Sequence, residues 1–103
     1  MTKSGHDYFG RSTAPGAFTI WTRNLNSTEF LESFQPSGCD SSFSVISVEA
    51  GVPDLALYAA GAASNTVGVG GFDPTVCAAG GWGIGGGAAG PWAPQFGMGV
   101  DSK

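Results

Sequence analysis

The sequence predicts one small domain, or part of one, that mixes strands and helix in the α+β or α/β class. Residues 43–51 (FSVISVEAG) alternate between two sets of side chains, which is the period of a strand. Residues 52–63 (VPDLALYAAGAA) follow with a helical pattern, and residues 66–71 (TVGVGG) form a short β-favouring run. This order of strand, helix and strand within 103 residues predicts a single mixed unit.

The part of the chain before this unit predicts further β structure. Residues 17–22 (AFTIWT) are a compact β-favouring run and predict a strand. Residues 29–34 (EFLESF) leave helix and strand open, because Phe30 and Phe34 have helical spacing and also share one edge of a pleated strand. Residues 35–42 (QPSGCDSS) predict a turn before the alternating strand.

The helical segment has signals at both ends. Pro53 suits the first turn of a helix, and the negative charge of Asp54 suits its positive N-terminal end. Gly61 is a candidate for the residue that ends the helix. The apolar stripe that we expect to face the core consists of Leu55, Tyr58 and Ala59.

Composition and charge argue against several classes of partner. The net charge is −4, with only four lysines and arginines, so no basic face for nucleic acid and no polybasic run for a membrane surface is expected. No apolar run approaches the ~20 residues of a membrane span. Cys39 and Cys77 lack the spacing of metal ligands, and no metal site is expected. No signal peptide is visible after Met1, and localisation stays open.

Glycine is concentrated in the second half of the chain, where 11 of the 18 glycines lie between Gly61 and Gly90. One interpretation is a low-complexity, structural segment, and a second is a Rossmann-type motif. The residues of the G-x-G-x-x-G pattern are Gly81, Gly83 and Gly86, with Asp101 at roughly the required distance. The preceding DPTVCAA is a weak strand, however, and the following GGAAGPWAP breaks helices.

A third interpretation is a loop that cradles a cofactor. Because glycine has no Cβ, backbone N–H groups can approach a phosphate, and a flat ring can lie against the main chain. Such a loop predicts a second, distant contact with the cofactor. His6, the chain's only histidine, lies in a polar, glycine-flanked loop and is the natural candidate, although a solvent-exposed terminal residue would look the same.

Three stretches resemble, in order and at the right spacing, the FAD-linked oxidases of the berberine-bridge-enzyme-like group, fungal type, in the vanillyl-alcohol-oxidase superfamily. They are SGHDYFGRSTAPGAFTIWTRNL (4–25), SVEAGV (47–52) followed by VGVGG (67–71), and PTVCAAGGWGIGGGAAGPWAPQFGMGVD (74–101). The resemblance implies an α+β, partial PCMH-type FAD-binding domain. We expect a small, mostly antiparallel sheet, one or two short helices and a glycine-rich loop. Residues 1–103 would be its second lobe, with the N-terminal lobe and the C-terminal substrate domain outside this chain.

The resemblance also implies roles for individual residues. His6 falls where the group attaches FAD covalently through the 8α-methyl carbon. The residues that fall near the pyrophosphate are Ser4, Gly5 and Asp7. Those that fall along the flavin are Gly71, Pro74, Thr75 and Val76, and those of the glycine-rich wall are Gly80, Gly81, Gly85 and Gly86.

The implied function is the FAD-binding part of a flavin-dependent oxidoreductase that acts on a small organic substrate. No catalytic base is identified, and the chain alone is expected to be inactive. Tyr8 is expected to pack within the histidine loop, and Tyr58 to pack in the core. The alternative is a non-enzymatic, glycine-rich structural or interaction protein without a cofactor.

Two departures from the group's pattern affect these expectations. Many members carry a cysteine just before P-T-V that makes a second bond to the flavin, whereas this chain has Asp73, so double attachment is not expected. Cys77 stands where the group usually has glycine, and is expected to be a small buried apolar residue.

Overall fold

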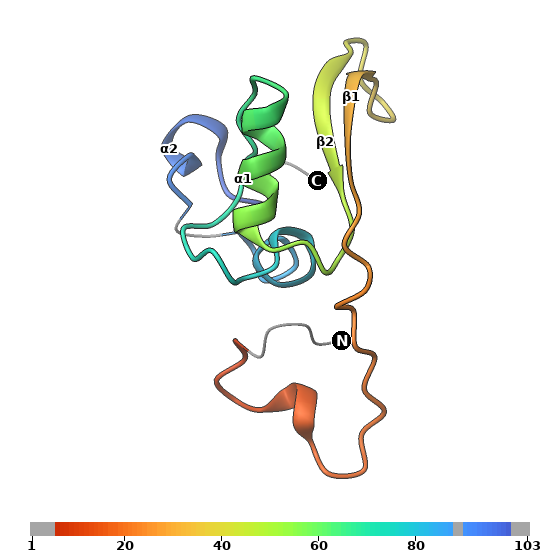
Figure 1. Ribbon diagram of the computed structural model, residues 1–103, viewed down its shortest axis with the longest axis vertical. Coiled ribbons are helices and arrows are strands. Elements are labelled where there is room, and N and C mark those ends of the chain that lie inside the picture. The colour runs from red at the N-terminus through yellow and green to blue at the C-terminus, as the bar shows by residue number, and fades with distance from the viewer. Residues whose placement is uncertain (1–5, 88–89, 100–103) are drawn as a thin grey trace.

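The computed structural model describes residues 6–87 and 90–99 of the chain. An arm that precedes the first strand contains a short 3₁₀ helix, Arg11–Thr13. The strands β1 (Thr28–Phe34) and β2 (Phe43–Val48) are followed by helix α1 (Asp54–Ala63). A π-helical turn, Ala78–Gly83, and the short helix α2 (Ala93–Phe96) complete the order. In Figure 1, α1 stands beside the two strands, and the arm extends below them.

The two strands form an antiparallel pair, which confirms the α+β prediction. Thr28 lies opposite Val48 and Phe30 opposite Ile46, with an irregularity before Phe34. The segment that left helix and strand open is therefore a strand, because its backbone pairs with β2. The alternating stretch is a strand over its first six residues, and the expected turn joins the two strands.

Helix α1 is confirmed, but its buried face is not the predicted one. Leu57 is buried and packs with Val52 and Ala78, whereas Leu55 is 64% exposed. Gly61 does not end the helix, which continues to Ala63. A Cβ at Gly61 would lie 3.0 Å from the backbone of the 66–68 segment, so this glycine allows the returning chain to pass close to the helix.

The other two predicted strands are wrong. Residues 17–20 have no regular structure, and Phe18 is 90% exposed in the arm. The 66–71 segment is irregular because its backbone binds α1 instead of a strand: the Thr66 N–H donates to the Gly61 carbonyl over 2.8 Å. A β-favouring run becomes a strand only where a neighbouring strand completes its hydrogen bonds.

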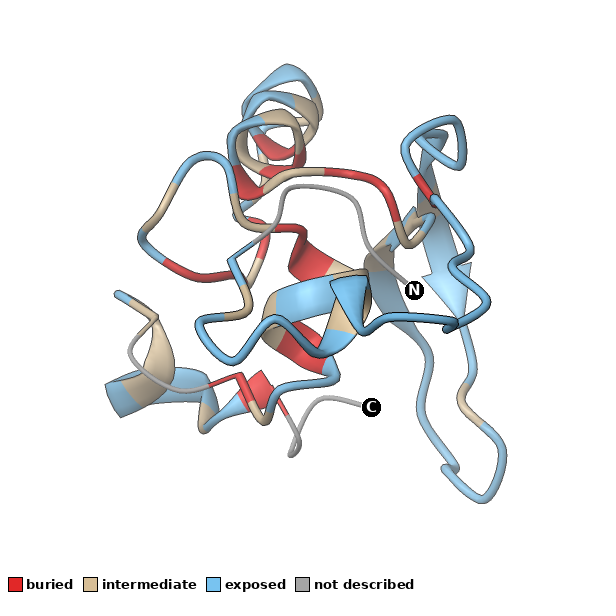
Figure 2. Cartoon of the chain, turned by 90° about the horizontal axis from the view of Figure 1, so that it is seen from below, coloured by how far each residue is buried: buried red, intermediate tan, exposed pale blue. Residues whose placement is uncertain are grey.

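The core lies where α1 begins and the glycine-rich segment passes beneath it. Figure 2 shows buried residues along this part, while the hairpin and the arm are mostly exposed. The first backbone N–H groups of α1 find acceptors there. The N–H of Asp54 donates to the Val76 carbonyl over 2.8 Å, and the N–H of Leu55 donates to the Pro74 carbonyl over 3.2 Å. The start of α1 therefore sets the position of residues 74–76.

Candidate functional site

The structure brings the histidine loop to the segment that precedes the glycine-rich turn. His6 Nε2 lies 2.8 Å from Thr75 Oγ1, although the two residues are 69 positions apart. The Thr75 hydroxyl donates to Asp73 Oδ1 over 2.8 Å, and the Thr75 backbone N–H donates to the same oxygen over 2.9 Å. His6 and Thr75 are both exposed, so a ligand can reach this group of side chains from solvent.

The histidine loop is held by its own charges. Asp7 pairs with Arg11 over 2.7 Å and also accepts from the Arg11 backbone N–H over 2.6 Å. The hydrogen bonds from the Arg11 side chain lower the pKa of Asp7 to about 2. Asp7 therefore stabilises the loop that carries His6. Tyr8 does not pack in this loop as predicted, since it is 97% exposed.

The turn that carries Thr75 is fixed from both sides. Its start is closed by the hydrogen bonds from Thr75 to Asp73, and these bonds lower the pKa of the Asp73 carboxyl. Its end is closed by Cys77, which pairs with Pro53 in an isolated bridge. Cys77 is 3% exposed, which confirms the prediction of a buried apolar residue.

The flat ring that most of the nearby glycines accommodate is the chain's own Trp82. A Cβ added at Gly71, Gly87, Gly90 or Gly99 would lie between 2.9 and 3.3 Å from an atom of this indole ring. At each of these four positions another atom would lie closer still, Asp54 Oδ2 at Gly71 and backbone atoms at the other three, so the missing side chains let both the indole and its neighbours pack closely. The sequence patterns did not point to Trp82; the signal was a single large aromatic residue inside a glycine-rich run.

The expected flavin-wall glycines divide by what surrounds them. A Cβ at Gly80 would overlap the carbonyl oxygen of Ala50, and one at Gly85 would lie 2.9 Å from the carbonyl oxygen of Gly81. At Gly81 the nearest atom is an ordinary 3.5 Å away, and at Gly86 the space is open. Packing within the protein explains Gly80 and Gly85, the positive φ of 106° explains Gly86, and packing does not require glycine at position 81.

The remaining expected residues are distributed as follows. Pro74 is exposed and Val76 is half-buried, both in the same turn as Thr75. Gly71 is buried against Trp82 and Asp54. Ser4 and Gly5 lie outside the described residues, as does Asp101 of the Rossmann-type pattern. That pattern begins inside the π-helical turn, which contains Gly81 and Gly83, and not after a strand, so it lacks the context that a Rossmann motif needs.

Sequence reasoning also missed a buried acid on α1. Asp54 is fully buried, and neither carboxylate oxygen has a hydrogen-bond partner within the described part of the chain. Burial raises the pKa of Asp54, and an N–H contact from Gly71 that falls short of hydrogen-bond geometry opposes this only in part. One turn later, the Tyr58 hydroxyl donates to the Gly71 carbonyl. The Tyr58 side chain therefore holds the chain just before the Thr75 turn.

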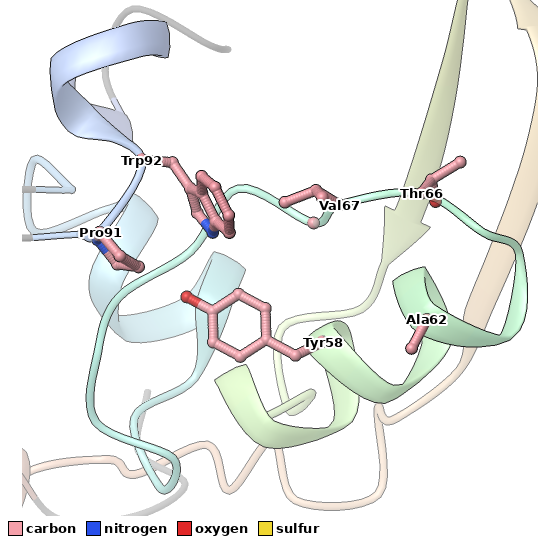
Figure 3. A pocket seen from close by; sticks show the side chains of 7 residues that line it. Tyr58, Ala62, Thr66, Val67, Pro91 and Trp92 are labelled. Atoms are coloured by element: carbon pink, nitrogen blue, oxygen red, sulfur yellow. The ribbon is translucent and has the colours of Figure 1, made fainter.

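An apolar cavity of about 270 Å³ lies on another side of Tyr58. Figure 3 shows its lining from α1, the 66–68 segment and the residues before α2; these are Tyr58, Ala62, Thr66, Val67, Gly68, Pro91 and Trp92. None of the expected cofactor residues lines it. Across residues 6–87 and 90–99, no helix is long and apolar enough to span a bilayer, and no three potential metal ligands cluster together.

The chain is similar to fungal FAD-linked oxidoreductases over almost its whole length. An uncharacterized FAD-linked oxidoreductase of Arthroderma benhamiae is 42% identical, with 99% of this chain and 18% of that protein covered. Aurantioclavine synthase of Penicillium expansum is 43% identical, with 99% of this chain and 22% of that protein covered. No protein-family model matches.

The fold is also similar to part of a solved structure. A VAO-type flavoprotein of Myceliophthora thermophila superposes with a TM-score of 0.81 at 31% identity, covering 95% of this chain and 17% of that one. The chain thus spans only a small part, between 17% and 22%, of the length of these three proteins.

Proposed function

The chain belongs to the vanillyl-alcohol-oxidase superfamily of flavoproteins, and we propose that it forms the second lobe of an FAD-binding domain in a flavin-dependent oxidoreductase. The match to FAD-linked oxidoreductases over 99% of the chain supports this proposal. No catalytic base is identified among these residues. We therefore propose that the 103 residues bind the cofactor and do not by themselves turn over the small organic substrate.

His6 is the proposed covalent anchor for FAD. The observation that carries this role is the 2.8 Å contact between His6 Nε2 and Thr75 Oγ1, because it joins the histidine loop to the proposed flavin-binding turn. When bound, FAD supplies the two-electron chemistry of the oxidoreductase. A ring nitrogen of His6 would form a bond to the 8α carbon as one C–H bond of that methyl group breaks. The two electrons and two protons released would pass to dioxygen.

The surrounding residues fit a flat, anionic cofactor in part. Thr75 is exposed and contacts His6, Pro74 is exposed next to Thr75, and open space borders Gly86. Asp7 is committed to Arg11, so its proposed contribution is the shape of the loop near the pyrophosphate. The roles of Ser4 and Gly5 stay predictions.

The test is the state of the flavin in the complete product of the gene that encodes this sequence. The protein is expected to be yellow, to keep its flavin through acid precipitation, and to give a flavin-bearing peptide that contains His6. His6→Ala is expected to release the flavin into the acid supernatant, while Thr19→Ala, in the same exposed arm, is expected to retain it. Release of flavin from the unmutated protein on acid precipitation would reject His6 as the covalent anchor. Absence of flavin altogether would favour the non-enzymatic alternative.

A further inference from the structure

We propose that Asp73 and Thr75 are positioning residues that orient His6 and leave its Nδ1 as the nitrogen that reacts. This inference rests on the proposed role of His6 as the flavin anchor. Neither similarity to relatives nor the spacing of motifs assigns a role to Asp73. Its carboxylate stands where the resemblance places a cysteine that forms a second flavin bond.

The proton of the Thr75 hydroxyl has two possible acceptors at 2.8 Å, Asp73 Oδ1 and His6 Nε2, and of these only the carboxylate cannot act as a donor instead. Asp73 Oδ1 lies 2.8 Å from Thr75 Oγ1 and 2.9 Å from the Thr75 backbone nitrogen. These bonds favour the ionised carboxyl, and the lowered pKa of Asp73 agrees with this. An ionised carboxylate can only accept hydrogen bonds. The single hydroxyl proton of Thr75 is therefore directed to Asp73.

The direction of this proton sets the tautomer of His6. With its proton directed to Asp73, Thr75 Oγ1 offers only lone pairs, so His6 Nε2 at 2.8 Å must be the donor. A neutral imidazole has one N–H, and the other nitrogen then carries the free lone pair. Nδ1 is thus the nucleophilic nitrogen, and no hydrogen bond to it is found among residues 6–87 and 90–99.

The geometry of the His6–Thr75 pair is fixed from both sides. The backbone on which Thr75 sits is held by α1, since the N–H of Leu55 donates to the carbonyl of Pro74 over 3.2 Å. The His6 loop is held separately by the Asp7–Arg11 pair. Two independently anchored segments thus meet at one hydrogen bond, which sets the orientation of the imidazole ring. Orientation of a ring by a partner on its other nitrogen is a general way to prepare a reactive histidine.

The first experiment measures the His6 ring in the purified 103-residue chain without flavin. Long-range ¹H–¹⁵N NMR at about pH 8 is expected to show the Nε2–H tautomer, with an NOE between the ring and the Thr75 methyl group. Thr75→Val keeps the shape but removes the hydroxyl, and is expected to remove the observable Nε2 proton. Thr75→Ser is expected to restore it, and Thr19→Val, the matched control, to leave it unchanged. An Nδ1–H tautomer, no NOE, or a chain without dispersed amide signals would overturn the proposal.

The second experiment measures covalent attachment in the complete gene product. Thr75→Val is expected to slow the appearance of acid-stable flavin, measured as a fraction of the total bound flavin, ~10-fold, and Thr75→Ser is expected to recover the rate. An unchanged rate in Thr75→Val would overturn the positioning role. The NMR result separates the two proposals: if the tautomer and the NOE are as expected but no covalent flavin forms on His6, the anchor function fails, and the reactive role of Nδ1 fails with it.

Discussion

Substitution of Gly80 by alanine tests whether the glycine-rich turn is dictated by packing within the protein. The added methyl group would overlap the carbonyl oxygen of Ala50 and lie 3.1 Å from its carbonyl carbon. Both sides of this contact are backbone, so no flexible side chain can move away. The π-helical turn and the chain before α1 would have to separate by about 1 Å to reach normal contact distances.

The cost follows from two terms. Overpacking of this kind costs ~1–3 kcal/mol. Separation of the same two segments would also stretch the hydrogen bond from the Ala78 N–H to the Val52 carbonyl, now 2.9 Å, at a cost of about 1 kcal/mol. The sum, ~2–4 kcal/mol, is a large share of the total stability of a small domain. It raises the equilibrium constant for unfolding by roughly 30- to 1000-fold.

The assay is urea denaturation followed by far-UV circular dichroism, with the neighbouring Gly81→Ala as the matched control. At Gly81 the nearest side-chain atom, on Val76, is 3.5 Å from the position that a Cβ would occupy, an ordinary contact. Alanine there is expected to leave the free energy of unfolding unchanged or to raise it by ~0.4–1 kcal/mol, because the unfolded chain loses conformational freedom. The urea midpoint then stays the same or increases. Equal midpoints for the two variants would refute the packing argument for Gly80.

Four further variants test which side chains of α1 contribute to stability. Leu57→Ala is expected to cost ~2–5 kcal/mol in urea unfolding and Leu55→Ala less than ~0.5 kcal/mol, because only the former is buried; equal losses would contradict the assignment of the core. Tyr58→Phe is expected to cost about 1 kcal/mol by loss of the hydrogen bond to the Gly71 carbonyl, and an unchanged midpoint would show that this bond contributes nothing. Burial raises the pKa of Asp54, so the folded chain binds the carboxyl proton more tightly than the unfolded chain does. The stabilisation from this bound proton is complete below the reference pKa of 3.8 and is lost as pH rises through the pKa of the folded state. Asp54→Asn is therefore expected to be less stable than or equal to the unmutated chain at about pH 3 and to gain on it towards about pH 7; a stability difference that does not change with pH would count against a raised pKa.

Local patterns predicted those elements whose neighbours in sequence are also their neighbours in space. The alternation of residues 43–48 and the helical run that ends at Ala63 are both read from a few consecutive residues, and both are present. The same patterns failed at residues 17–22 and at Leu55. In those cases the outcome depended on which other segment was available to pair with the backbone or to cover the side chain.

For the candidate site, the sequence alone determined the residue types and the resemblance: a histidine loop at one end and a glycine-rich run at the other, in the order of an FAD-linked oxidoreductase. Only the tertiary structure decided that His6 meets Thr75, that Asp73 accepts the hydroxyl proton of Thr75, and that Trp82 fills the space among four glycines. The physical reason is range. Periodicity and propensity act over a few residues, whereas hydrogen bonds and packing join residues up to 69 positions apart, and these depend on how the whole chain folds.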